Sequence, residues 1–324
     1  MCTAITYLGE NHYFGRTLDY EHSFGEKIII TSRNFPFSLR CTEEIKTHYA
    51  IIGMGIVSNN FPLYFDATNE VGLSMAGLLF PDYAVYHQAK TDKENIASFE
   101  LIPYVLSQCA TTKEASELLK NVNVCDISFS EEFPKTPLHW IISDRNGSIT
   151  VESVSDGLFI YENPTGVLTN SPPFPFQLFH LENHMAVSPL PPKNTFSQKL
   201  SLQTYSRGMG GLGLPGDFSS SSRFVRASFS ALNSHSENDE QGCVNQFFHI
   251  LGSVCQVRGC VITEDGKLEH TQYSSCINTD KGIYYYTTYE NSSLNAVCLF
   301  DQDLDTQRLY TFPLIRQWRV NFQS

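Results

Sequence analysis

The residue with the greatest chemical potential in this chain is Cys2, which directly follows Met1. A small side chain at this position favours removal of Met1, so we expect the processed chain to begin with a residue that carries both a thiol and a free α-amine. The reference pKa values of these groups, about 8.5 and about 7.7–8.0, both lie near neutral pH. One N-terminal residue can therefore supply a nucleophile and a base without a separate histidine.

Two charged residues, Arg16 and Asp19, follow closely in the stretch Gly15-Arg16-Thr17-Leu18-Asp19-Tyr20. An arginine lowers the pKa of a nearby thiol because it favours the thiolate. A carboxylate three residues further on is expected to hold the α-ammonium of Cys2. Residue chemistry alone leaves a plainer alternative open, in which Cys2 is a small buried apolar residue and Arg16 and Asp19 form a surface pair.

Composition limits the classes of function. The chain has 324 residues, 41% of them hydrophobic, which is long and apolar enough for a sizeable core in one large or two ordinary domains. The net charge of −12 argues against nucleic-acid binding and against docking to an anionic membrane. Without a long apolar run or a signal peptide at the N-terminus, we expect a cytoplasmic protein that does not enter the membrane.

Nine cysteines occur at irregular spacing with no CxxC pair, so neither a disulfide framework nor a zinc site is indicated. We expect reduced thiols, no metal and no cofactor. His139 lies inside an apolar strand pattern and is expected to be a hydrogen-bonded core histidine. The glycine-rich run at residues 208–213 lacks the GK[ST] of a phosphate loop and is followed by Pro215, which favours a plain turn.

The order of predicted elements indicates an α+β architecture without regular βαβ alternation. A capping-box pattern of Thr111 with Glu114 starts the second helix. Six prolines in residues 171–192 predict a long, extended loop packed on the domain. The expected strands cover residues 2–7, 13–16, 27–31, 49–54, 72–77, 138–143, 148–153, 158–161, 282–289 and 294–299, and the expected helices cover 97–109, 111–119, 224–232 and 244–254.

Eight separate stretches resemble one family, the choloylglycine hydrolases, which include bile salt hydrolases and penicillin V acylases of the N-terminal nucleophile hydrolase superfamily. The stretches occur in the family's order from Met1 to about residue 300. The resemblance implies a four-layer αββα sandwich, a single domain over residues 1–324 and a homotetramer. The stretches are MCTAITY, YFGRTLDYE, NEVGLSMAGL, PLHWIISD, GVLTNSP, GLGLPGDFSSSSRF, QFFHILGSV and KGIYYYTTYEN.

The same resemblance assigns roles to five residues. The family's nucleophile falls on Cys2, with the arginine beside the thiol on Arg16 and the carboxylate near the amine on Asp19. The asparagine of the oxyanion hole falls on Asn170 in GVLTNSP. The second active-site arginine falls on Arg223 in SSSSRF.

One position departs from the family pattern. Where many bile salt hydrolases have asparagine and penicillin V acylases have tyrosine, this chain has Leu79. The family is thought to use the backbone N–H at this position for the oxyanion, and leucine retains that donor. The missing side-chain amide leaves the choice of substrate open.

Four apolar residues fall where the walls of the family's acyl pocket are expected, and ordinary core packing is the alternative for each. Phe129 lies between two serines, and we expect it to be exposed. The four residues are Leu18, Phe65, Phe129 and Phe133.

The implied activity is hydrolysis of the amide bond in glycine- or taurine-conjugated bile salts through a thioester on Cys2. Two alternatives stay open. One is a penicillin V acylase or another N-acyl amide hydrolase, such as one acting on acyl-homoserine lactones. The other is an inactive protein that binds steroid acids, which requires that Met1 be retained.

Overall fold

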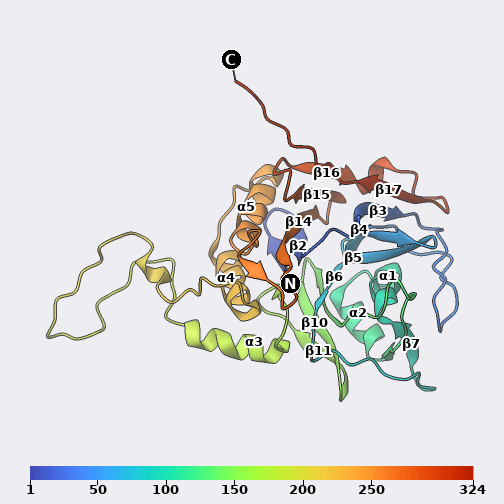
Figure 1. The fold of residues 1–324 in the computed structure, drawn as a ribbon, viewed down its shortest axis with the longest axis horizontal. Helices are drawn as coiled ribbons and strands as arrows, with labels where there is room; N and C mark the ends of the chain where they lie inside the picture. The colour runs from blue at the N-terminus through green and yellow to red at the C-terminus, as the bar shows by residue number, and fades with distance from the viewer. Residues whose placement is uncertain (324) are drawn as a thin grey trace.

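Two β-sheets stacked face to face form the centre of the molecule (Figure 1). The computed structural model describes residues 1–323. The strands are β1 (Cys2–Leu8), β2 (His12–Tyr20), β3 (Lys27–Thr31), β4 (Ile51–Ser58), β5 (Phe61–Asn69), β6 (Ser74–Leu79), β7 (Glu94–Ala97), β8 (Val122–Cys125), β9 (Leu138–Asp144), β10 (Gly147–Val154), β11 (Gly157–Glu162), β12 (Val167–Leu168), β13 (Val261–Ile262), β14 (Leu268–Asn278), β15 (Ile283–Thr288), β16 (Asn295–Cys298) and β17 (Leu309–Pro313). The helices are α1 (Leu101–Gln108), α2 (Thr112–Leu119), α3 (Phe174–Leu181), α4 (Ser220–Asn233) and α5 (Glu240–Gly252).

The two sheets differ in where the chain ends enter them. The first has the order β12-β1-β2-β14-β15-β16, with β13 paired to β14, so the N-terminal strand lies inside a sheet completed by the C-terminal third of the chain. The second has the order β11-β10-β9-β6-β5-β4-β3-β17. Both are antiparallel, whereas the separate small β7–β8 pair is parallel.

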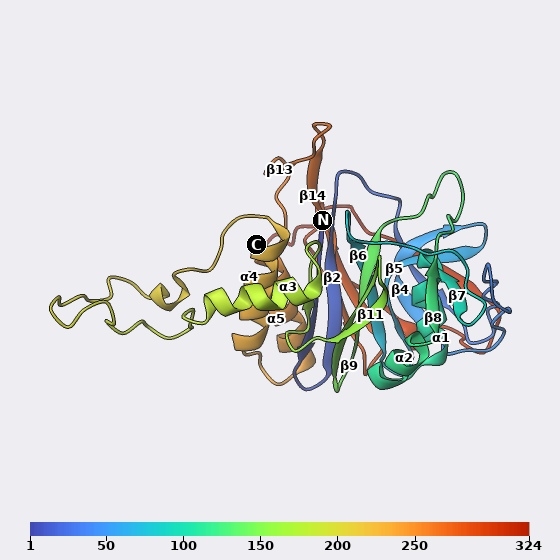
Figure 2. The same ribbon diagram turned by 90° about the horizontal axis from the view of Figure 1, so that it is seen from below.

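Helices cover the outer face of each sheet. Helices α4 and α5 pack on β1 and β14 of the first sheet, while α1 and α2 pack on β5, β9 and β10 of the second (Figures 1 and 2). One apolar core joins the two sheets and α4 and α5, and a second core lies between the eight-stranded sheet and α1 and α2. The layers are therefore helix, sheet, sheet, helix, as predicted.

The hairpin of β1 and β2 fixes the surroundings of Cys2. Cys2 lies opposite Leu18, and Ala4 lies opposite Arg16. Because directly opposed residues share a face of an antiparallel sheet, these four side chains point toward the second sheet. Thr3, Thr17 and Asp19 have the opposite parity and point toward the helix layer.

Close approach of β14 to β2 requires glycine at position 15. A Cβ atom built on Gly15 would lie 2.0 Å from the backbone oxygen of Ser275. The residue before Arg16 is therefore glycine because the backbone of β14 occupies the space of a side chain.

Most predicted strands are confirmed, and the helix start at Thr111 is confirmed by its side-chain bond to the N–H of Glu114. The Glu114 carboxylate accepts from the N–H of Ala110 and not from that of Thr111, so the capping box is displaced by one residue. Seven strands were absent from the prediction: β5, β7, β8, β12, β13, β14 and β17. Of the three long ones, β14 is rich in polar residues, and β5 and β17 each carry a proline.

The prediction for residues 171–192 was wrong in two respects. Helix α3 begins directly after Pro173 and carries Pro175 in its first turn, where a proline costs no helical hydrogen bond. The segment that follows projects away from the sandwich as a long arm, residues 185–216, and does not pack on it (Figures 1 and 2). Within the arm, Met185, Phe196 and Tyr205 are more than 80% exposed.

Candidate active site

Two arginines approach Cys2 from opposite faces of the first sheet. Cys2 begins β1 and is only 2% exposed. Arg16 belongs to the face that meets the second sheet, and Arg223 extends from α4 on the helix side. The arrangement places positive charge on both sides of a single residue.

Arg16 fills the point where the pairing of β5 with β6 stops. That ladder ends at Asp66 opposite Ala76. The Nη1 atom of Arg16 donates to the carbonyl oxygens of the next residues, Phe65 at 3.1 Å and Gly77 at 2.6 Å. Burial would lower the pKa of this guanidinium, but the negative charges of Cys2, Tyr273, Asp66 and Asp19 outweigh it and raise the pKa above the usual value.

Arg223 binds the backbone at Cys2 directly. Its Nη1 donates to the carbonyl oxygen of Cys2 and, at 2.7 Å, to the hydroxyl of Thr3, and its Nη2 donates to Oδ1 of Asn170 at 2.8 Å. The side chain is fully buried, so Arg223 is not on a solvated helix face. Burial lowers the pKa of Arg223, and the charges of Asp19 and Cys2 oppose that shift.

The backbone of Asp19 forms two hydrogen bonds with Met1. Its N–H donates to the carbonyl oxygen of Met1 at 2.8 Å, and its own carbonyl oxygen accepts from the Met1 amine. Its carboxylate accepts from the hydroxyls of Thr271 at 2.6 Å and Thr17 at 3.2 Å. A direct role for this carboxylate at the Cys2 amine stays a prediction.

The amine of Met1 has a partner that sequence reasoning missed. It lies 2.9 Å from the carboxylate of Glu269 on β14, a residue that is 7% exposed. Met1 thus continues the β1 ladder by one residue and keeps Glu269 neutralised. No spacing in the sequence pointed to Glu269, because it enters through a strand that was not predicted.

Asn170 and Leu79 are joined by a hydrogen bond. Nδ2 of Asn170 donates to the carbonyl oxygen of Leu79 at 2.8 Å, while its Oδ1 accepts from the N–H of Cys2 at 2.9 Å and from Arg223. These partners fix the orientation of the amide and leave the second Nδ2 hydrogen free to serve another acceptor.

The N–H of Leu79 points the same way as its carbonyl. Phe80 donates to Pro137 across the β6–β9 ladder, so Leu79, which lies opposite Leu138, is in the non-hydrogen-bonded position of that ladder. Its N–H and C=O therefore point away from β9, toward Asn170. The N–H of Leu79 and the Nδ2 of Asn170 therefore lie close together, and their role as an oxyanion hole stays a prediction.

Ser220, at the start of α4, holds Asn170 in place. Its Oγ accepts from the backbone N–H of Asn170 at 2.8 Å and lies 2.9 Å from the hydroxyl of Thr169. Sequence reasoning gave Ser220 no role. His139 contacts the same segment, because its ring lies between Glu152 and the carbonyl of Thr169. It is fully buried, which confirms it as a hydrogen-bonded core histidine.

The four residues predicted to line the acyl pocket fall into two groups. Leu18 lies beside Cys2 on the same face, and the backbone of Phe65 binds Arg16 while its ring contacts that of Phe24, an aromatic residue that sequence reasoning missed. Phe129 and Phe133 pack in the core on the α1 side of the second sheet. Phe129 is 8% exposed, so the expectation that it is exposed was wrong. The pocket role of all four stays a prediction.

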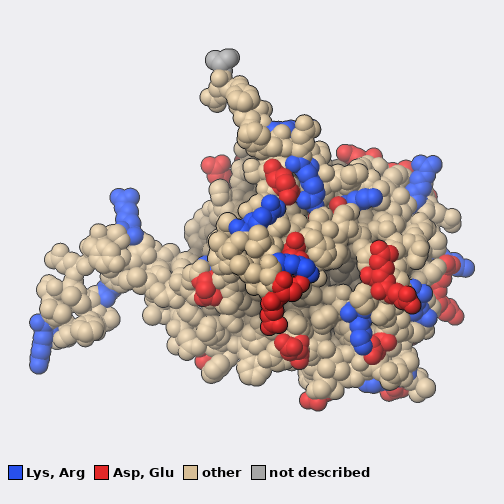
Figure 3. Space-filling view, in the orientation of Figure 1, with Lys and Arg blue, Asp and Glu red and all other residues tan. Residues whose placement is uncertain are grey.

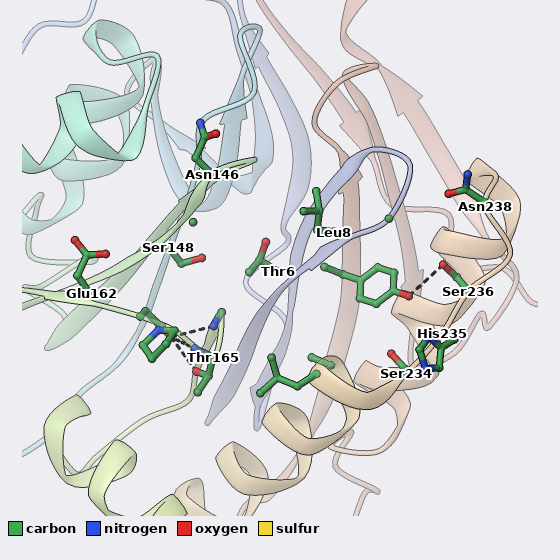
Figure 4. A pocket seen from close by; sticks show the side chains of 18 residues that line it. Thr6, Leu8, Asn146, Ser148, Glu162, Thr165, Ser234, His235, Ser236 and Asn238 are labelled. Carbon is green, nitrogen blue, oxygen red and sulfur yellow. Dashed lines mark hydrogen bonds between the residues drawn. The ribbon is translucent and has the colours of Figure 1, made fainter. Parts of the chain in front are cut away.

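A sizeable cavity lies elsewhere. It has a volume of about 830 Å³ and is lined by the far end of β1, the β9–β10 turn and the loop after α4 (Figure 4). Its labelled residues include Thr6, Ser148, Glu162 and Ser236, and none of the residues gathered around Cys2. Across residues 1–323, no group of three or more His, Cys, Asp or Glu is placed to hold a metal ion. Over the same residues, no helix has the length and apolar character needed to cross a bilayer.

A β1 strand that starts at a buried cysteine, inside an αββα sandwich, defines the N-terminal nucleophile hydrolase fold. Residues 2–312 match the linear amide C–N hydrolases of the choloylglycine hydrolase family, and the chain belongs to that family. It is therefore a hydrolase that acts on linear amide C–N bonds.

Several relatives are similar over almost the whole chain. The bile salt hydrolase/transferase of Lactiplantibacillus plantarum is 53% identical over 97% of each chain. That of Clostridium perfringens is 38% identical over 99% of each chain. A crystal structure of a mutant conjugated bile acid hydrolase from the same Clostridium superposes with a TM-score of 0.92 at 37% identity, covering 100% of both chains. A penicillin V acylase from Agrobacterium tumefaciens, at 20% identity and a TM-score of 0.77 over 96% of this chain and 91% of its own, shares the fold.

Proposed function

We propose that this protein is a cysteine amidase that hydrolyses the amide bond between a bile acid and glycine or taurine. The similarity to bile salt hydrolases over the full chain supports this substrate class. The observation that carries the proposal is the convergence on Cys2 of two buried arginines and the Asn170–Leu79 donor pair. We also propose that residues 1–324 act as one catalytic domain.

In the first half of the reaction, the Cys2 thiolate attacks the amide carbonyl carbon. The carbonyl oxygen becomes an oxyanion and accepts hydrogen bonds from Nδ2 of Asn170 and the N–H of Leu79. The α-ammonium of Cys2 then gives a proton to the departing amine nitrogen, and the C–N bond breaks. The acyl group stays on sulfur as a thioester.

In the second half, the now neutral α-amine removes a proton from water, and the hydroxide attacks the thioester carbonyl. The same two donors hold the second oxyanion. The C–S bond breaks, the thiolate is restored beside Arg16, and the free acid leaves. Arg223 keeps the carbonyl oxygen of Cys2 and the side chain of Asn170 in place through both steps.

Penicillin V acylase activity is the second candidate function, because the residue at position 79 does not point to bile salts over penicillin V. Both the asparagine of many bile salt hydrolases and the tyrosine of the acylases are absent at this position. Leu79 is partly exposed and adds an apolar surface beside the donor pair. Other N-acyl amides, including acyl-homoserine lactones, belong to the same second candidate.

The test is a substrate panel on protein whose N-terminus has been identified by intact mass. Glycocholate and taurocholate should be turned over, and penicillin V far more slowly. Cys2→Ser should abolish turnover while the unfolding temperature stays unchanged. If penicillin V is turned over fastest, it replaces bile salts as the proposed substrate. Full activity in Cys2→Ser, or in protein that retains Met1, would refute the mechanism. A folded protein that turns over none of the substrates would instead fit a steroid-acid binder.

We further propose a cytoplasmic homo-oligomer, a tetramer by family resemblance, in which the arm at residues 185–216 contacts a second copy. The arm exposes several large apolar side chains. It also carries Lys193, Lys199 and Arg207 but no acidic residue, whereas all 34 acidic residues lie on the rest of the chain. Figure 3 shows this contrast as blue without red on the arm and many red atoms on the body. Opposite charge and exposed apolar surface both favour contact between copies.

A further inference from the structure

The charge of Arg16 is not balanced by any direct ion pair. The guanidinium is 1% exposed, and its three hydrogen-bond acceptors are the carbonyl oxygens of Thr17, Phe65 and Gly77. Over residues 1–323, no carboxylate lies within ion-pair distance of it. Burial of an unbalanced charge is costly, so a nearby negative group must offset it.

Asp66 is placed to provide that negative charge. It lies at the end of the β5–β6 ladder, one residue before the Phe65–Gly77 pair that binds Arg16, and it is 2% exposed. Its carboxylate accepts from the hydroxyls of Tyr273 at 2.8 Å and Tyr284 at 2.5 Å.

A third hydroxyl connects Asp66 to Arg16. Ser275 Oγ lies 3.4 Å from the Asp66 carboxylate and accepts from the backbone N–H of Arg16 at 3.2 Å. An ionised carboxylate only accepts hydrogen bonds, so three hydroxyl donors suit the charged form. Burial raises the pKa of Asp66 above its usual value, and Arg16, Tyr284, Tyr273 and Ser275 reduce that rise without cancelling it.

We propose that Asp66 is a positioning residue for the nucleophile: it is the buried counter-charge of Arg16, and it limits how strongly that guanidinium stabilises the Cys2 thiolate. This inference rests on the proposed function, in which Cys2 is the nucleophile. On the helix side of the sheet, the charge of Asp19 opposes the lowering of the Arg223 pKa by burial.

A limit of this kind has a chemical purpose. A thiol that is too acidic gives a thiolate that is a weaker nucleophile, and the most effective thiol has a pKa close to the working pH. Two arginines without counter-charges would stabilise the thiolate more strongly and make it a weaker nucleophile. Asp66 keeps the thiolate available and still reactive.

The test is the pH dependence of Cys2 alkylation by iodoacetamide, followed on the N-terminal peptide by mass spectrometry. The titratable and charged groups around Cys2, counted on both faces of the sheet, are Arg16, Asp19 and Tyr20 on β2, Glu269 and Tyr273 on β14, Asp66 on β5, Arg223 on α4, and the α-amine itself. Asp66→Asn removes one negative charge from this set at constant volume. The alkylation midpoint should move to lower pH by roughly one unit, and the plateau rate should fall about 2- to 3-fold.

Asp144→Asn is the matched control. Asp144 is also a buried carboxylate, but it binds Thr112 and Asn146 at the far end of β9, so its removal should leave the Cys2 profile unchanged. If Asp66→Asn does not fold, Tyr284→Phe removes one donor from Asp66 and should give a smaller shift in the same direction. An unchanged or higher midpoint in the folded variant would overturn the proposal.

Alkylation does not depend on the substrate, so the two proposals fail differently. A wrong substrate leaves the Cys2 profile and its response to Asp66→Asn intact. A different cysteine modified in the inactivated enzyme would instead contradict the proposed function itself.

Discussion

Asn170 makes a residue-scale contribution that no other side chain can replace, because its two amide ends serve different partners. Oδ1 receives the N–H of Cys2 and Arg223, and Nδ2 binds the carbonyl of Leu79. The proposed nucleophile, the second arginine and the proposed second oxyanion donor therefore all meet at one amide group.

Asn170→Asp should reduce kcat by about 100- to 1,000-fold, because the carboxylate keeps the acceptor and loses the donor that the oxyanion needs. Leu79→Ala should stay within about tenfold of the wild type, because the backbone N–H remains. Steady-state kinetics on the preferred substrate would compare them. A loss in Leu79→Ala as large as in Asn170→Asp would show that the Leu79 side chain, and not its backbone, serves the reaction.

At the residue scale, the sequence allowed prediction of the groups that lie close together along the chain. Cys2, Arg16 and Asp19 share one hairpin, so their proximity follows from pairing between neighbouring strands. Asn170 and Arg223 were found only through family resemblance. Glu269 and Asp66 were not found, because a buried carboxylate in a strand has no signature until its partners on other strands are known.

Two adjacent serines at the start of helix α4 make different contacts, one within the helix and one with Asn170. Ser219 is its N-cap and accepts from the N–H of Ser222. Ser220, the first helical residue, uses its hydroxyl to hold the backbone N–H of Asn170. The start of the helix therefore holds Asn170, the proposed oxyanion donor, and Arg223 follows one turn later.

Ser219→Ala should lower the free energy of unfolding by about 1 kcal/mol with little change in kcat, because it removes only the cap. Ser220→Ala should lower kcat several-fold with a smaller loss of stability, because Asn170 loses an anchor. Urea unfolding and steady-state kinetics on both variants would separate the roles. Equal effects of both substitutions on kcat would argue against a positioning role for Ser220.

At the scale of elements, the predictions failed where polar residues are buried. Strand β14 reads LEHTQYSSCIN, and almost all of it is buried. Its hydroxyls bind Asp19, Asp66 and Arg16. These hydrogen bonds, and not apolar side chains, offset the cost of burying the strand. Helix α3 was missed for a different reason: its prolines fall at the start, where local composition alone favours extended chain.

Across the whole molecule, the two sheets are joined at the end away from Cys2 by a buried histidine. Nε2 of His12 lies 2.6 Å from the hydroxyl of Thr6 and 3.1 Å from that of Ser143 on the second sheet. Burial lowers the pKa of His12 to about 4, against the opposing charges of Asp144 and Asp280. Burial therefore favours the neutral imidazole at this bridge.

Stability should therefore fall as the pH drops from about 6.5 toward about 4. In that window His12 binds a proton in the unfolded chain but not in the folded one. The contribution of His12 to the free energy of unfolding is therefore full above pH 6.5 and decreases by about 3 kcal/mol by pH 4. Urea unfolding of the wild type and His12→Gln should show a smaller pH dependence in the variant. His22→Gln, an exposed control, should behave as the wild type; equal slopes in all three proteins would contradict the assignment.

The arm gives a second prediction at this scale. Replacing Phe196 and Tyr205 by serine should shift the oligomer toward smaller species, because both side chains are more than 80% exposed in the single chain. Light scattering coupled to size exclusion would give the mass. Leu8→Ser, an exposed apolar residue on the sandwich, is the control. An unchanged mass in the arm variant would place the contact between copies elsewhere.

Arg16 belongs to one sheet and ends among the carbonyl oxygens of the other. During refolding, each sheet could form its own ladders while the thiol still lacked its buried cation. Recovery of alkylation at neutral pH would then report the docking of the sheets, and circular dichroism would report the earlier formation of strands. The rate at which Cys2 regains its reactivity would therefore measure how fast the two sheets dock.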